Sequence, residues 1–160
     1  MGSTITSRAV LTVAALSLVG CARIISPVAP PPYRADIPAP YSATWTAIVR
    51  ALEKQNVPLR AIARDSGVIA TDNFVTPIGV WADCGRIGDE ALEGEAVVAF
   101  TIFAEADGDH TRMQLNSKMH TRAYGRGVSG RRKYDPVLQC ASTGRFEANL
   151  VDAVVERVKH

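Results

Sequence analysis

Residues 95–122 read EAVVAFTIFAEADGDHTRMQLNSKMHTR and have the clearest strand pattern in the chain. Its first ten residues are rich in β-branched and aromatic side chains, and Asp107 with Gly108 supplies a tight turn. Over 110–122 apolar or small residues alternate strictly with polar or charged ones. The stretch therefore predicts a β-hairpin with one buried and one solvated face.

Helical and strand patterns flank this hairpin on both sides. An apolar stripe predicts a helix over 43–55 with Ser42 as its N-cap, and a second stripe predicts a helix over 145–158. Between them, 59–64 and 68–75 predict another hairpin. The order helix, hairpin, hairpin, helix predicts an α+β fold. We expect a two-layer sandwich, with an antiparallel sheet of about four strands and both helices on one face.

The N-terminus has the pattern of an export signal. The apolar run 9–18 follows Arg8 and is too short to cross a hydrocarbon core of about 30 Å. The residues 18–21, LVGC, resemble the lipobox of bacterial lipoproteins. This resemblance implies cleavage before Cys21 and a diacylglycerol thioether on its sulfur, with palmitate-type acylation of the new amine. The alternative is ordinary signal-peptidase cleavage, with Cys21 as a spare thiol.

The chain accordingly divides into three parts. We expect a signal peptide over 1–20, a lipidated cysteine and proline-rich tether over 21–40, and one α+β domain over 41–160. Six prolines crowd the segment 27–40. In polyproline II geometry the tether would reach on the order of 60 Å from the membrane. A proline-rich recognition motif is the alternative reading of the same residues.

The domain also resembles a known envelope family. A Trp-bearing amphipathic helix is followed by a strand and then by DSGVIATDNFV at 65–75. This pattern is similar to the helix-grip domains of the BamC (NlpB) outer-membrane assembly lipoproteins. The similarity covers 41–75 and, more loosely, the last hairpin and helix, although that family has two such domains. It implies a grip-like fold and a scaffold-like, non-enzymatic use, and it carries over no functional residue.

Two cysteines remain once Cys21 is assigned to the lipid. Cys84 and Cys140 form an even pair in an exported chain, which predicts a disulfide between them. A redox pair or catalytic thiol is the alternative, but the CxxC spacing is lacking. The pair would close a long loop and contribute about 4 kcal/mol on the chain-entropy model.

Other residues suited to catalysis or metal binding have simpler explanations. His110 and His120 share a strand face but lie about 33 Å apart on a regular strand, so they cannot hold one metal ion. The acidic residues over 89–95 fit a solvated loop. No Ser, His and Asp arrangement can be assembled from the sequence. We therefore predict no enzyme activity, no cofactor and no metal.

The segment 122–134, RAYGRGVSGRRKY, is basic and rich in glycine. It predicts a flexible loop that could contact anionic lipid, lipopolysaccharide phosphates or an acidic protein surface. The alternative is a solvated connection. The formal net charge of +2 does not indicate any class of partner, and a nucleic acid is not an expected partner of an exported chain. The candidate contacts are Arg122, Arg126, Arg131, Arg132 and Lys133.

These features together predict a lipid-anchored module at the periplasmic face of the outer membrane, since Ala22 is not the aspartate that favours inner-membrane retention. Its leading function is non-catalytic interaction with an envelope protein, as a scaffold in outer-membrane assembly or integrity. The alternative is a binding module for an anionic lipid, lipopolysaccharide or cell-wall ligand. A thiol-dependent or hydrolytic enzyme is the third hypothesis.

Overall fold

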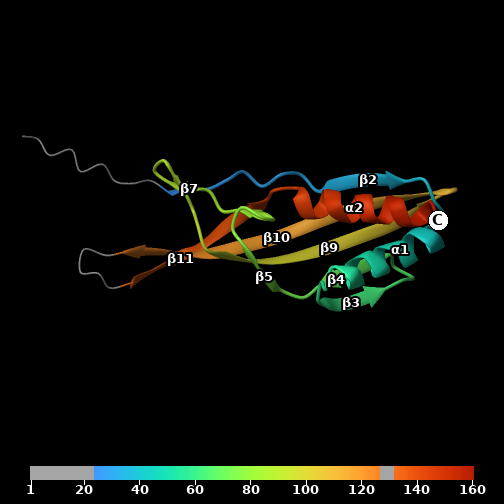
Figure 1. The fold of residues 1–160 in the computed structure, drawn as a ribbon, viewed down its shortest axis with the longest axis horizontal. Coiled ribbons are helices and arrows are strands. Elements are labelled where there is room, and N and C mark those ends of the chain that lie inside the picture. Colours follow the sequence, from blue (N-terminus) through green and yellow to red (C-terminus); the bar gives the residue numbers. More distant parts are fainter. Residues whose placement is uncertain (1–23, 127–131) are drawn as a thin grey trace, which may run out of the picture.

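The fold combines two antiparallel sheets with two helices, in a computed structural model that describes residues 24–126 and 132–160 (Figure 1). The helices are α1 (Tyr41–Lys54) and α2 (Arg145–Val158). The strands, in chain order, are β1 (Ile24–Ile25), β2 (Tyr33–Ile37), β3 (Leu59–Ala63), β4 (Val68–Thr71), β5 (Phe74–Pro77), β6 (Ala82–Asp83), β7 (Arg86–Ile87), β8 (Glu90–Ala91), β9 (Glu95–Asp107), β10 (His110–Arg126) and β11 (Arg132–Ser142).

The expected four-stranded sandwich is wrong, because the main sheet has eight strands. Its path is β3-β4-β9-β10-β11-β6, with β2 on β10 and β5 on β9, and a separate three-stranded sheet has the order β1-β7-β8. The reason is the length of the central hairpin. Strands β9 and β10 hold 13 and 17 residues, far more than their neighbours. The outer edge of each therefore pairs with two different strands in succession.

The hydrophobic core lies between the main sheet and the two helices. Alternate residues of β9 point into it, and the ring of Phe100 stacks on Phe146 of α2 with centroids 3.9 Å apart. Helix α1 contributes Trp45, Ile48 and Leu52, which are all buried. The two apolar stripes predicted from the sequence are thus the faces that pack onto the sheet.

Helix α2 has the predicted bounds, whereas α1 starts two residues early. It begins at Tyr41, with Pro40 in the N-cap position and no side-chain cap. The backbone amide of Thr44 donates to the carbonyl of Pro40 at 3.0 Å. Ser42 therefore lies inside the helix and is not its cap.

Part of the expected tether belongs to the sheet. Residues 33–37 form β2, which pairs with β10 from Tyr33 opposite Leu115 to Ile37 opposite Thr111. Ile37 is fully buried, and the hydroxyl of Thr111 donates to the carbonyl of Ala39 at 2.9 Å. Alternate residues of β2 meet the core, although the neighbouring prolines obscure this pattern in the sequence. Ordered structure therefore begins well before residue 41.

The segment expected to be a flexible basic loop is mostly strand. Strand β10 continues to Arg126, and β11 begins at Arg132. The pairing shifts between Arg122 and Tyr124, so that one residue of β10 faces two residues of β11, of which one is Pro136. A bulge is a position where proline's missing amide hydrogen does not break the ladder.

Candidate functional site

The main sheet has one face that the helices do not cover. Residues of β10 that alternate with the buried Met113 and Leu115 lie on this face, among them Arg112, Gln114 and Asn116. Within the described ranges, both helices pack on the opposite face through the core. We call this uncovered side the open face. The sequence predicted it correctly as the solvated face of the 95–122 hairpin.

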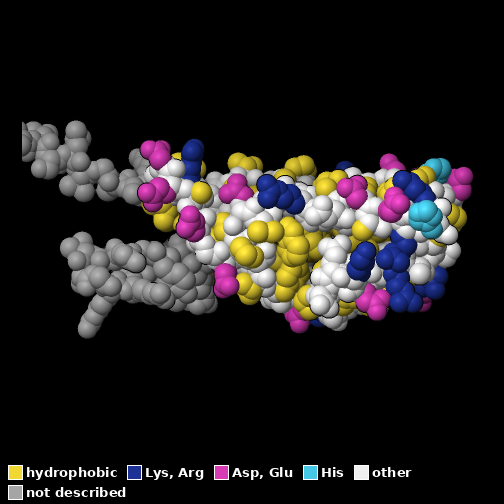
Figure 2. Space-filling view, viewed as in Figure 1, with side chains coloured by type: hydrophobic (Ala, Val, Ile, Leu, Met, Phe, Trp, Pro, Cys, Tyr) yellow, Lys and Arg dark blue, Asp and Glu magenta, His cyan; other side chains and the backbone are white. Residues whose placement is uncertain are grey.

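A groove of about 1110 Å³ lies at the end of the sheet that carries the β9–β10 turn. It forms where β2, the β3–β4 turn and the β9–β10 hairpin come together. Figure 2 shows the face on which the helices lie, where Lys and Arg side chains and carboxylates gather at the same end of the molecule. The groove is lined by Arg34, Ala35, Asp36, Tyr41, Asp65, Ser66, Gly67, Phe103, Ala104, Glu105, Ala106, Arg112, Met113, Gln114 and Asn116.

Gly67 allows the β3–β4 turn to approach the wall of the groove. Its φ is +68°, and a Cβ at this position would lie 2.1 Å from the carbonyl oxygen of Ala104. The amide of Ala104 donates to the carbonyl of Gly67 at 2.8 Å. Any side chain here would push the turn away from β9, so glycine is required by both conformation and space.

A row of polar side chains crosses the floor of the groove. The Nε of Arg34 donates to Gln114 Oε1 at 3.2 Å, and Gln114 Nε2 donates to Asn116 Oδ1 at 3.1 Å. The Nε of Arg112 lies 3.2 Å from Asp107 Oδ2. Exposed contacts of this kind add little to stability. They do hold two guanidinium groups in defined positions, where a ligand would meet them.

Apolar side chains interrupt this polar surface. Phe103 is 39% exposed and sits opposite Val68 of β4. Further along the same face, Val75 of β5 is 57% exposed. An aromatic ring beside arginines is the composition that distinguishes protein interfaces from ordinary surface.

Two carboxylates differ from the others in their surroundings. At the β9–β10 turn, a hydrogen bond from the His110 ring at 2.7 Å holds the pKa of the exposed Asp109 carboxyl below its usual value. In the first turn of α2, Glu147 is buried, and its Oε2 has no hydrogen-bond partner among the described residues. The positive end of the helix dipole partly compensates a negative charge at this position. The sequence pattern of this helix gave no sign that Glu147 is buried.

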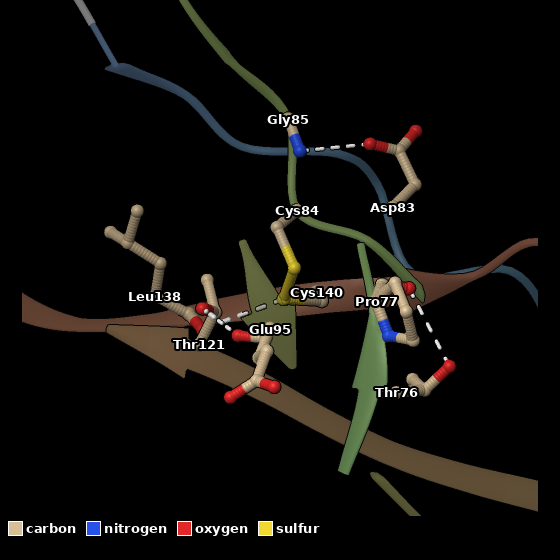
Figure 3. Close-up of a disulfide and its surroundings, with 9 residues drawn as sticks. All are labelled: Thr76, Pro77, Asp83, Cys84, Gly85, Glu95, Thr121, Leu138 and Cys140. Atoms are coloured by element: carbon tan, nitrogen blue, oxygen red, sulfur yellow. Dashed lines mark hydrogen bonds between the residues drawn. A yellow bond between two sulfur atoms is a disulfide. The ribbon is translucent and has the colours of Figure 1, made fainter. Parts of the chain in front are cut away.

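The predicted disulfide is present and joins Cys84 to Cys140 (Figure 3). Cys84 is fully buried and follows β6, whereas Cys140 belongs to β11. Beside it, the amide of Gly85 donates to Asp83 Oδ1 at 2.8 Å. The bond therefore fastens the start of the small sheet, β1-β7-β8, to the main sheet.

Two of the predicted site residues, Cys21 and Arg131, lie outside the described residues. The other four basic residues belong to strands, with Arg122 and Arg126 in β10 and Arg132 and Lys133 in β11. Across the ladder, Arg126 pairs with Arg132 and Gly125 with Lys133.

Across 24–126 and 132–160, no three His, Cys, Asp or Glu residues are grouped so that they could hold a metal ion. In the same part of the chain, neither helix has the length and apolar character needed to span a bilayer.

Comparison with known proteins identifies no family. No family model and no curated protein matches the sequence. Among solved structures, the chain is similar to a DUF4468 family protein from Bacteroides ovatus, with 9% sequence identity and a TM-score of 0.36. The match covers 88% of this chain and 85% of that one.

The groove is the feature that the sequence did not reveal. Its residues come from β2, the β3–β4 turn and the central hairpin, which are separated by up to about eighty positions. The available signal was the polar row of β10 in the alternating pattern, together with Phe103 among its neighbours.

Proposed function

We propose that this chain is a lipid-anchored, non-catalytic interaction module of the bacterial envelope, held at the outer membrane through Cys21. In this proposal the groove docks a segment of a partner protein. The observation that carries it is the combination of Phe103 with charged side chains of both signs on an open sheet face.

The charges of the groove indicate the chemistry of its partner. The lining of the groove includes two arginines, Arg34 and Arg112. It also includes three carboxylates, those of Asp36, Asp65 and Glu105. A polyanion such as lipopolysaccharide would meet more negative than positive groups here. A polypeptide with both acidic and basic side chains, and an apolar one for Phe103, complements the lining better. Complementary charges of this kind fix the register of a complex and select its partner.

The test compares three variants of the natively lipidated protein in cells, after gentle crosslinking. Phe103→Ala removes the apolar contact, and Arg112→Glu reverses one charge of the groove. Lys118→Glu is the matched control, because it lies on the same strand and face but outside the groove. Equal melting temperatures of the purified variants exclude misfolding as the cause of any loss.

We expect Phe103→Ala and Arg112→Glu each to reduce one crosslinked protein about tenfold or more, the size of a hot-spot effect, while Lys118→Glu retains it. If all three variants recover the same proteins as the wild type, or if the wild type recovers none, the groove is not a protein-docking site. Retention of lipopolysaccharide in place of protein would favour the anionic-ligand alternative and would also overturn the proposal.

A further inference from the structure

The chain is fixed to the domain within three residues of Cys21. Strand β1 pairs antiparallel with β7, with Ile24 opposite Ile87 and Ile25 opposite Arg86. Strand β7 pairs in turn with β8. The segment that follows the lipidation site is therefore an integral strand of the small sheet, and not a free tether.

Gly85 makes this attachment possible. Its φ is +85°, and a Cβ there would lie 1.9 Å from the carbonyl oxygen of Ile25 and 3.2 Å from the Cδ of Pro27. The carbonyl of Gly85 also accepts from the amide of Leu92 at 2.9 Å. Because the disulfide fixes the preceding residue to β11, the main sheet, the small sheet and the N-terminal segment form one connected unit.

This attachment limits the distance between the lipid and the domain. Three residues, even fully extended, span at most about 11 Å. An acyl chain on Cys21 would hold the small sheet within that distance of the headgroup region. The reach of about 60 Å expected for a polyproline tether does not apply, since β1 and β2 each fix the chain to a sheet.

We propose that the small sheet is a membrane-contact surface that orients the domain, with the groove pointing away from the bilayer; this rests on the proposed acylation of Cys21. Its exposed aliphatic side chains are Ile24 (41% exposed) and Ile25 (47%), and Val28 (91%) lies in the segment that follows β1. Side chains of this kind partition into the boundary between headgroups and acyl chains.

The charges of the small sheet specify the lipid chemistry. Arg86 is outnumbered by Asp89 and Glu90, and all three are exposed. Carboxylates are repelled by an anionic surface, so the small sheet itself suits a zwitterionic headgroup layer, although Arg126 and Arg132 of the β10–β11 hairpin lie at the same end of the molecule (Figure 1). Contact by the small sheet therefore requires no anionic lipid.

The groove then faces the aqueous side. Figure 1 shows the small sheet and the β9–β10 turn at opposite ends of the long axis. At about 3.3 Å per residue, the 13 residues of β9 extend about 40 Å between these ends. A module held in this orientation presents its groove to partners at that height above the membrane.

The test measures which end of the full-length lipidated protein lies near the bilayer. A fluorescent amino acid is placed at Asp89 in the β7–β8 turn or at Asp109 in the β9–β10 turn. The protein is reconstituted into phosphatidylcholine vesicles that contain a headgroup-attached nitroxide quencher. We expect quenching several-fold stronger at position 89 than at 109 in vesicles of phosphatidylcholine alone. Equal quenching at the two positions would overturn the proposal.

Two variants connect this orientation with the small sheet. Gly85→Ala should displace 25–27 and reduce the difference in quenching, whereas Gly88→Ala, with a φ of +60° but no atom within 4 Å of the added Cβ, should preserve it.

A flexible insert of about ten Gly and Ser residues after Ala22 leaves the domain unchanged and adds about 17 Å of average reach. It should weaken quenching at position 89, and unchanged quenching would contradict close attachment.

The outcome also separates this inference from the proposed function. If the wild-type protein does not sediment with vesicles, lipid anchoring itself fails. If it sediments but both positions are quenched equally, anchoring stands and the orienting role of the small sheet is wrong.

Discussion

Removing the disulfide should cost the domain a large part of its stability. Cys84 and Cys140 are separated by 56 positions. In the chain-entropy model, releasing a loop of this length lowers the free energy of unfolding by about 4 kcal/mol. Unfolding entropy of about 2.1 cal/mol/K per residue, over a folded part of roughly 140 residues, converts this loss into a fall in Tm of about 14 °C. A whole domain is stable by only about 5–15 kcal/mol.

Urea unfolding of the wild-type protein with and without reductant measures this loss. The double variant Cys84→Ala/Cys140→Ala is the control, because its transition should match that of the reduced wild type and should not respond to reductant. A shift below about 1 kcal/mol on reduction would refute the chain-entropy reasoning. Two thiols that alkylate without reductant in the exported protein would refute the bond itself.

Three further predictions concern single side chains. Phe146→Ala removes the ring stacked on Phe100, and we expect urea unfolding to show a loss of about 3–5 kcal/mol in the free energy of unfolding. The control Val75→Ala, at an exposed position, should change this free energy by less than about 0.5 kcal/mol. Thr71→Val deprives the buried amide of Phe100 of its 2.9 Å acceptor and should cost about 1–3 kcal/mol, whereas a neutral effect would show that the amide finds another partner. The lowered pKa of Asp109 means that its stabilising contribution is present above the usual 3.8 and is lost as the pH falls through the lower folded value. An NMR titration midpoint for this carboxyl at or above 3.8 would contradict that assignment.

The sequence predicted the elements that have a long and regular pattern. In the central hairpin, 110–122 alternates strictly and 95–104 is rich in β-branched and aromatic residues, and α2 carries an apolar stripe from Phe146 to Val158. Such patterns survive because each element buries one whole face. The disulfide followed from the cysteine count and the expected compartment, since only one pairing remains once Cys21 is excluded.

The missed strands lack a readable pattern for identifiable reasons. Strand β2 follows three consecutive prolines, and β11 contains Pro136 and basic residues that are typical of loops. Strands β1, β6, β7 and β8 hold two residues each, which is too short for any period. The size of the main sheet could not be predicted either, because it depends on how many strands pair with the outer edges of β9 and β10.

The groove and the small sheet depend on long-range contacts. Arg34 reaches Gln114 only after β2 has joined β10, eighty positions away. In the same way, the carbonyl of Ile25 lies beside Gly85 only because the chain between them folds back through the main sheet. Sequence patterns report local geometry and burial, so they identify the residues of such sites without bringing them together.

The most direct test of lipid anchoring is the intact mass of the mature protein extracted from bacterial membranes. We predict a polypeptide that begins at Cys21 and carries a diacylglyceryl group on sulfur, with an additional acyl group on the amine. We also expect the protein to stay in the membrane fraction after washing with high salt. A mature chain that still begins at Met1, or one that begins at an unmodified Cys21 and is released by salt, would contradict lipid anchoring.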